Sequence, residues 1–115
     1  MHALIIEDEP FIAMLIEDHL RPLGYTTFDF AGTEAEAVAA AQNQCPDLIT
    51  SDMRLPQGSG VGAVQSICRH RHIPVVFITA SAWEVRQQMS DAIVVRKPID
   101  AGELGSAVTA SGIVP

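Results

Sequence analysis

Short runs of apolar and β-branched residues alternate with longer segments of helical periodicity along the chain. Five such runs predict strands, at residues 3–6, 25–30, 48–51, 75–78 and 93–95. The first, third and fourth runs are nearly all apolar, which is typical of strands covered on both faces, so these three are expected in the centre of a sheet. Strands that alternate with helices in this way indicate an α/β domain with a parallel sheet.

Five segments predict helices. The first is expected to begin near Pro10, because proline is favoured in an opening turn. Its apolar residues at helical spacing predict a buried stripe of Ile12, Leu15, Ile16 and Leu20. The second begins at about Thr33, where Glu36 is placed to complete a capping box. Its apolar positions are Ala35, Val38, Ala39 and Ala41. The other three are expected at 62–69, at 83–89 and from about Asp100, the last anchored by Leu104 and Val108.

Five polar residues follow the ends of the apolar runs. Glu7 and Asp8 come after the first run, Asp52 after the third, Thr79 after the fourth and Lys97 after the fifth. The carboxyl ends of the strands in an open α/β sheet share one edge, and ligands bind in the crevice outside that edge. Three carboxylates, a hydroxyl and an ammonium are therefore expected to converge in one site.

The charges of these residues indicate a metal ion and a phosphoryl group. Two carboxylates about 4 Å apart repel by about 4 kcal/mol at an effective dielectric constant near 20, so a cation is expected among Glu7, Asp8 and Asp52. A hydrated pocket of oxygen ligands suits Mg²⁺, which takes one or two carboxylates together with phosphate oxygens. Lys97 and Thr79 could neutralise a phosphoryl group carried on a carboxylate, and such transfer depends mainly on positioning and charge neutralisation.

Composition narrows the classes of function. The 115 residues, 48% of them hydrophobic, fit a single domain over residues 1–115. A net charge of −7 argues against direct binding to nucleic acid. Cys45 and Cys68 lack the spacing of a disulfide framework or a zinc site and are expected to be packing residues. No apolar run approaches the roughly 20 residues that span a bilayer, so a soluble cytoplasmic protein without a membrane partner is expected.

A series of motifs covers essentially the whole chain. In order, they are Glu7-Asp8-Glu9-Pro10, Leu23-Gly24-Tyr25, Pro46-Asp47-Leu48, Asp52 with Pro56 and Gly60, Ile73-Pro74-Val75, Thr79-Ala80 and Lys97-Pro98. Together they resemble the receiver domain of two-component response regulators. The resemblance implies one flavodoxin-like domain with a five-stranded parallel sheet of order 2-1-3-4-5, helices on both faces, and a cis bond between Lys97 and Pro98.

The resemblance also implies a role for each site residue. Asp52 would be the phosphoacceptor, and Thr79 and Lys97 would bind the phosphoryl oxygens. Mg²⁺ would be held by Glu7, Asp8, Asp52 and the backbone carbonyl of Arg54. The donor would be a histidine kinase or a histidine phosphotransfer protein, and the output a contact with a protein target that the sequence does not identify. Such a stand-alone receiver is a signalling domain and not an enzyme, although it assists its own phosphotransfer and dephosphorylation.

Three departures from the family pattern concern the output. Val94 occupies a position that is usually Tyr or Phe, whose rotation accompanies movement of the threonine hydroxyl. The segment between Thr79 and Lys97 is about one helical turn shorter than in the family, which predicts a truncated fourth helix. Ile99 replaces a common phenylalanine. These differences predict an unusual response to phosphorylation.

One helix face and one aromatic residue add further expectations. Phe11, Ala13 and Met14 make the first helix apolar almost all round over its first two turns, so part of this surface is expected to stay exposed. In the family this helix faces the helical bundle of the donor, and Met14 with Phe11 is predicted to contact it. Trp83 is expected to be a packing residue.

Several alternatives stay open. Within the family, the chain could be a phosphorylation-independent interaction module, or a relay or sink that passes phosphate on without its own output. A homodimer is also left open. Two other classes are disfavoured: Glu7-Asp8-Glu9 would repel the phosphate of a flavin, and Arg54 stands where an aspartate-based phosphohydrolase needs a second acid.

Overall fold

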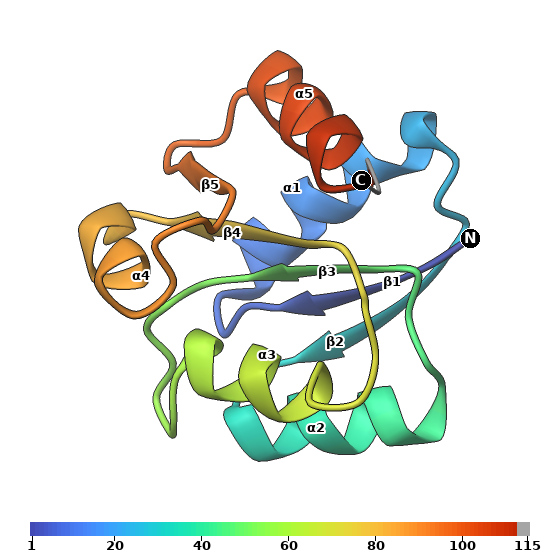
Figure 1. The fold of residues 1–115 in the computed structure, drawn as a ribbon. Coiled ribbons are helices and arrows are strands. Elements are labelled where there is room, and N and C mark those ends of the chain that lie inside the picture. Colours follow the sequence, from blue (N-terminus) through green and yellow to red (C-terminus); the bar gives the residue numbers. More distant parts are fainter. Residues whose placement is uncertain (113–115) are drawn as a thin grey trace.

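The computed structural model describes residues 1–112 and shows five strands and five α-helices in strict alternation (Figure 1). The strands are β1 (His2–Ile6), β2 (Thr27–Ala31), β3 (Leu48–Ser51), β4 (Val75–Thr79) and β5 (Val94–Arg96). The helices are α1 (Pro10–Leu20), α2 (Glu34–Asn43), α3 (Gly60–Ile67), α4 (Ala82–Gln88) and α5 (Ala101–Ser111), with a 3-10 turn at Arg21–Leu23 after α1.

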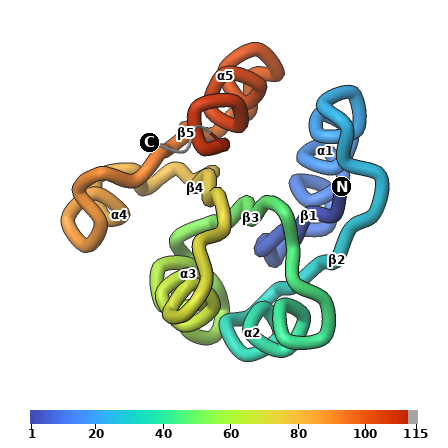
Figure 2. The backbone as a smooth tube through the Cα atoms, turned by 45° about the vertical axis from the view of Figure 1, so that its right-hand side comes forward, coloured from blue at the N-terminus to red at the C-terminus, as the bar shows by residue number. Residues whose placement is uncertain are grey.

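All neighbouring strands pair in parallel, in the order β2-β1-β3-β4-β5, which confirms the predicted flavodoxin-like topology. The three strands expected at the centre of the sheet are the central ones. Helices α1 and α5 cover one face, and α2 and α3 cover the other, while α4 lies beside β4 and β5 at the end of the sheet (Figure 2). The carboxyl ends of the strands lie on the left of Figure 1, near α4.

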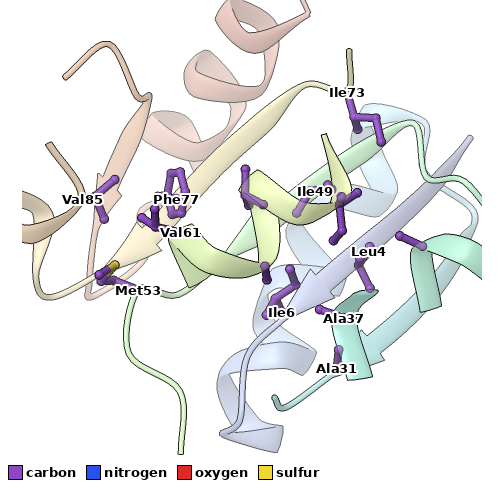
Figure 3. Packing of buried hydrophobic residues seen from close by; sticks show 14 residues of the cluster. Leu4, Ile6, Ala31, Ala37, Ile49, Met53, Val61, Ile73, Phe77 and Val85 are labelled. Carbon is purple, nitrogen blue, oxygen red and sulfur yellow. The ribbon is translucent and has the colours of Figure 1, made fainter. Parts of the chain in front are cut away.

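Two apolar clusters hold these layers together. One lies between the sheet and the helices α2, α3 and α4, and the other lies between the sheet and the helices α1 and α5. In the first cluster, Met53 from the loop after β3 packs with Val61 of α3 and Phe77 of β4, and Val85 of α4 joins them (Figure 3). The loop that follows β3 is therefore anchored in the core at its second residue.

The buried helix stripes differ in part from the prediction. In α1, Ile16 and Leu20 are buried as expected, but the third buried residue is Ala13, and Ile12 and Leu15 are only half-buried. In α2 the buried residues are Ala37 and Ala41.

Ala35 and Ala39, which were expected on the apolar face of α2, are exposed, so this part of the prediction is wrong. A helix this rich in alanine has little contrast between its sides, and the register of the helix on the sheet decides which alanines are buried.

Several boundaries also move. Helix α3 begins at Gly60, two residues before the prediction, because the Ser59 side chain accepts a hydrogen bond from the Gly62 N–H and caps the helix there. Strand β2 begins at Thr27 and not at residue 25, and strand β5 is displaced by one residue. Cys45 and Trp83 were expected to pack inside, and both are exposed, Trp83 by 62%.

The departures around α4 and α5 are visible in the structure. Helix α4 has seven residues, as the short segment predicted. Val94 lies half-buried in register with Phe77 of β4. Helix α5 runs unbroken past its glycines, since Asp100 caps its start and its two predicted anchors, Leu104 and Val108, are buried. The Lys97-Pro98 bond is cis, as expected.

No helix within residues 1–112 is both long and apolar enough to cross a membrane.

Candidate functional site

Backbone hydrogen bonds place the candidate residues at the carboxyl edge of the sheet. They continue the pairing of the strands by one step beyond their ends. The Glu7 N–H donates to the Ala31 carbonyl at 2.8 Å, and the Asp52 N–H donates to the Ile6 carbonyl at 3.0 Å. The Lys97 N–H donates to the Thr79 carbonyl at 3.2 Å. Each of these three side chains is therefore fixed at its base by the sheet itself.

Three carboxylates meet at this edge, as the sequence predicted. One oxygen atom from each of Glu7, Asp8 and Asp52 lies within 4.8 Å of the others. Glu7 is buried, Asp52 is half-buried and Asp8 is exposed, so the cluster opens to solvent on the Asp8 side.

The Lys97 ammonium joins this cluster. Its Nζ donates to Glu7 Oε1 and to Asp52 Oδ2, both at 2.8 Å. The lysine side chain is 18% exposed, which shields these two bonds from water. Lys97 thus supplies the positive charge that like-charged carboxylates at this distance require.

Burial and pairing shift two pKa values in this cluster. Burial is the largest influence on Glu7 and raises the pKa of its carboxyl above the ordinary 4.5, although hydrogen bonds from Lys97 and from the Glu9 N–H act the other way. Burial alone would lower the pKa of Lys97, but hydrogen bonds to Asp52 and Glu7 outweigh it and raise this pKa above 10.5. The ammonium is therefore charged throughout the physiological range. Burial makes the ionised form of Glu7 less favourable than it would be in water.

We expect Glu7→Gln to weaken the pH dependence of the free energy of unfolding of the metal-free protein between pH 4 and pH 8. A raised carboxyl pKa gives stability that is fully present below pH 4.5 and is lost as the pH rises through the folded-state value. The substituted amide cannot ionise, so the difference between variant and wild type should grow over that window. Urea unfolding between pH 4 and pH 8 measures it, and a variant with the same pH dependence as wild type would contradict this reading.

Thr79 lies at the same edge, buried at the end of β4. Its hydroxyl accepts a hydrogen bond from the Ser81 N–H at 3.0 Å. The structure thus brings together the three carboxylates and the lysine, and it places the threonine hydroxyl at the same edge with a backbone partner of its own.

The loop after Asp52 is held by contacts that sequence reasoning did not anticipate. On one side, Glu34 of α2 accepts a hydrogen bond from the Ser59 N–H at 3.0 Å, and its own N–H donates to the Gln57 carbonyl. On the other side, the Arg54 guanidinium binds the Glu84 carboxylate of α4, with Nε to Oε1 at 3.0 Å. The two side-chain contacts join residues 25 and 30 positions apart, and no local pattern marks them.

Gly60 closes this loop against the phosphoacceptor candidate. Its N–H donates to the Met53 carbonyl at 2.9 Å, and its Cα lies so close to the preceding strand that a Cβ would be 1.7 Å from the Asp52 carbonyl oxygen. A side chain at position 60 would clash with the backbone of Asp52, which explains why this position is a glycine.

The donor set fits Mg²⁺. It consists of carboxylate oxygens from Glu7, Asp8 and Asp52, open to water through Asp8, which is the chemistry that a partly hydrated, hard divalent cation prefers. Nitrogen and sulfur ligands are absent from this group of three, which argues against a zinc site of the structural kind.

Comparison with known proteins agrees with this geometry. The family model described as response regulator receiver domain matches residues 3–109. The chain belongs to this family. Receiver domains are signalling domains of two-component systems, and an acidic cluster that typically binds Mg²⁺ is one of their features.

Individual relatives support the assignment of this receiver domain. The phyllosphere-induced regulator PhyR of Methylorubrum extorquens is 34% identical over 110 residues, which cover 92% of this chain and 41% of that protein. The receiver domain of PhyR from Erythrobacter litoralis, solved in solution by NMR, is 32% identical with a TM-score of 0.87, over 96% of this chain and 88% of that one. This receiver domain thus spans about two-fifths of the length of the first of these regulators.

A third relative shows the metal chemistry in another protein. The receiver domain of a sensor histidine kinase from Pseudomonas aeruginosa was solved with a magnesium ion coordinated in its active-site cleft. It is 28% identical to this receiver domain with a TM-score of 0.80, over 95% of this chain and 94% of that one.

Proposed function

We propose that this receiver domain, taken as a unit over residues 1–115, accepts a phosphoryl group on Asp52 from a phosphohistidine donor. Residues 113–115 lie outside the described part of the chain. The observation that carries the proposal is the pair of 2.8 Å bonds from Lys97 to Asp52 and Glu7 beside three clustered carboxylates. The Lys97 ammonium, the Asp52 carboxylate proposed as acceptor and the three carboxylates that could bind a metal ion therefore lie at one edge of the sheet.

The chemistry is a transfer between two nucleophiles. A carboxylate oxygen of Asp52 attacks the phosphorus, the bond from phosphorus to the donor's imidazole nitrogen breaks, and that nitrogen leaves with the electron pair. Lys97 is placed to neutralise charge on the transferred group, because its Nζ already contacts Asp52 Oδ2. Thr79 would turn its hydroxyl from the Ser81 N–H toward a phosphoryl oxygen.

Mg²⁺ would be held by Glu7, Asp8, Asp52 and the backbone carbonyl of Arg54. When bound, it supplies charge neutralisation to the phosphoryl oxygens. The same residues would assist hydrolysis of the acyl phosphate, so that the domain contributes to its own dephosphorylation without acting on a free substrate.

The test is incubation with acetyl phosphate, with and without Mg²⁺, followed by intact mass spectrometry. We expect one added phosphoryl group that requires Mg²⁺, and no addition to Asp52→Asn. An unmodified wild-type protein at saturating Mg²⁺ would contradict the proposal and would favour the phosphorylation-independent interaction module. A relay or sink would instead show rapid return of the phosphoryl group to a histidine donor.

The donor is proposed to dock on α1. Phe11 is 70% exposed and Met14 is 61% exposed on this helix, as the sequence predicted. Beside them a groove of about 430 Å³ runs toward the carboxylate cluster, with Pro10 and Phe30 in its lining. Apolar surface next to the acceptor suits the helical bundle of a histidine kinase or histidine phosphotransfer protein.

We expect Met14→Asp to slow phosphotransfer from the cognate donor by about fivefold or more, since loss of a well-placed apolar contact costs about 1 kcal/mol or more. Transfer from acetyl phosphate should be unchanged, because that small donor needs no docking surface. Stopped-flow or gel-based transfer assays measure the first rate and mass spectrometry the second. Equal rates for wild type and variant with the protein donor would exclude α1 as the docking face.

A further inference from the structure

The Arg54–Glu84 ion pair joins the phosphoacceptor loop to α4. The guanidinium of Arg54 donates to Glu84 Oε1 through Nε at 3.0 Å and also through Nη2. The two side chains differ in exposure: Glu84 is 21% exposed and Arg54 is 73% exposed. The carboxylate is thus fixed against the fold, while the guanidinium reaches it from the solvent side.

Arg54 is close to Asp52 along the chain and in space. Its backbone N–H points at Asp52 Oδ1 with a distance of 3.4 Å. The loop is anchored at Ser59, which is bonded to Glu34, and at Met53, which is packed in the core. The Arg54 side chain, 73% exposed, is therefore a part of this loop that lies beside the acceptor and outside the core.

A phosphoryl group on Asp52 would change the electrostatic balance at Arg54. It carries between about 1.5 and 2 negative charges and offers three strong acceptor oxygens to a guanidinium, whereas Glu84 offers one charge. An exposed ion pair is weak, so a nearby group of higher charge can compete for the guanidinium.

We propose that Arg54 exchanges Glu84 for the phosphoryl group when Asp52 is phosphorylated, and that this exchange transmits the signal to α4. The inference rests on the proposed phosphorylation of Asp52. Arg54 acts here through its side chain, in addition to the metal-binding role proposed for its carbonyl, and Glu84 is a positioning residue that holds the guanidinium in the resting state.

Helix α4 is suited to respond to such an exchange. It has seven residues, and its first residue follows Ser81, whose side chain makes no capping hydrogen bond. Glu84 lies in its first turn, between the buried residues Ala82 and Val85, so the ion pair is a tertiary contact at the turn that packs against the core. Val94 stands where the family has its aromatic relay, and the ion pair offers a different connection between the site and this helix.

Trp83 makes the exchange measurable. It is the one tryptophan in the sequence, it precedes Glu84 in α4, and it is 62% exposed. A change in the first turn of α4 should therefore alter its fluorescence. Beryllium fluoride with Mg²⁺, a stable analogue of a phosphoryl group, serves as the probe.

The decisive variant is Glu84→Gln, with Glu103→Gln as the control. Both changes remove one carboxylate from the first turn of a helix, but the Glu103 side chain is exposed and lies on α5, away from Arg54. In wild type and in the control we expect beryllium fluoride to shift the Trp83 emission. In Glu84→Gln the resting emission should already be displaced in the same direction, and the further change should lose most of its amplitude.

The intact mass after acetyl phosphate treatment distinguishes failure of the proposed exchange from failure of the proposed phosphorylation. A Glu84→Gln protein that takes up one phosphoryl group and still shows the full wild-type Trp83 response would overturn the exchange and leave phosphorylation standing. A wild-type protein that is stoichiometrically phosphorylated with no change in Trp83 emission would also overturn the exchange. A wild-type protein that takes up no phosphoryl group would overturn the proposed function and the exchange together.

Discussion

Gly60→Ala is expected to lower the free energy of unfolding by about 3 kcal/mol, because overpacking against backbone atoms cannot be relieved by a side-chain rotation. The new Cβ would lie 1.7 Å from the Asp52 carbonyl oxygen and 2.5 Å from Ser51 Oγ. Either α3 moves away from the sheet or the end of β3 shifts, and both displace the proposed phosphoacceptor. Urea unfolding measures the loss, and phosphorylation by acetyl phosphate at low temperature measures the displacement.

Gly105→Ala is the matched control. A Cβ at Gly105 meets no atom within 4 Å, and the residue lies in the interior of α5. We expect this variant to be more stable than wild type by about 0.5 to 1 kcal/mol, which is the usual gain in helix propensity from glycine to alanine. A Gly60→Ala protein as stable as wild type would show that the contact between α3 and the phosphoacceptor loop is looser than described.

Lys97→Met is expected to slow phosphorylation of Asp52 by about 10²-fold to 10³-fold, the cost of removing one placed group that stabilises developing charge. The variant keeps an unbranched side chain and removes the ammonium that bonds to Asp52 and Glu7 at 2.8 Å. It also leaves Glu7 buried without its counterion, so the metal-free variant should be less stable at pH 8 than at pH 5. Initial rates with acetyl phosphate give the first effect and urea unfolding gives the second.

Arg96→Met distinguishes a local effect from a change in net charge. Arg96 precedes Lys97 in the chain, and its side chain is exposed. This control removes the same charge and should retain nearly the wild-type rate. If both variants slowed phosphorylation equally, the contacts of Lys97 would not be the cause, and overall charge would explain the effect.

Much of the fold could be predicted from residue patterns, because the central strands are nearly all apolar and the site lies at their carboxyl ends. The apolar runs at β1, β3 and β4 were typical of strands covered on both faces, and the polar residues after them had to meet at one edge. The convergence of Glu7, Asp8, Asp52 and Lys97 is therefore a consequence of topology and was predictable.

The sequence was less informative where several arrangements have similar energies. The alanine-rich α2 has weak contrast between its sides, so its exposed positions, Ala35 and Ala39, were assigned wrongly. Trp83 is apolar and was expected inside, but α4 has only seven residues, and its buried side is occupied by Ala82 and Val85. A helix this short has no second apolar face to bury a large ring.

The contacts made by charged side chains between distant segments were beyond sequence reasoning. From the sequence, Arg54 had a predicted role only through its backbone carbonyl, as a metal ligand. Glu84 had no predicted role. Their pairing depends on how the loop after β3 lies beside α4, which is set by the packing of Met53 and Val85 in the same cluster. No spacing along the chain encodes that proximity.

Locating the phosphoryl group on the chain would test the central claim. Borohydride reduction of the acetyl phosphate-treated protein converts an aspartyl phosphate into homoserine, and peptide fragmentation then identifies the residue. We predict homoserine at position 52 alone, formed only when Mg²⁺ is present. Modification at Glu7 or Asp8, or an unreduced phosphoryl group on a histidine, would contradict the assignment of Asp52 as the acceptor.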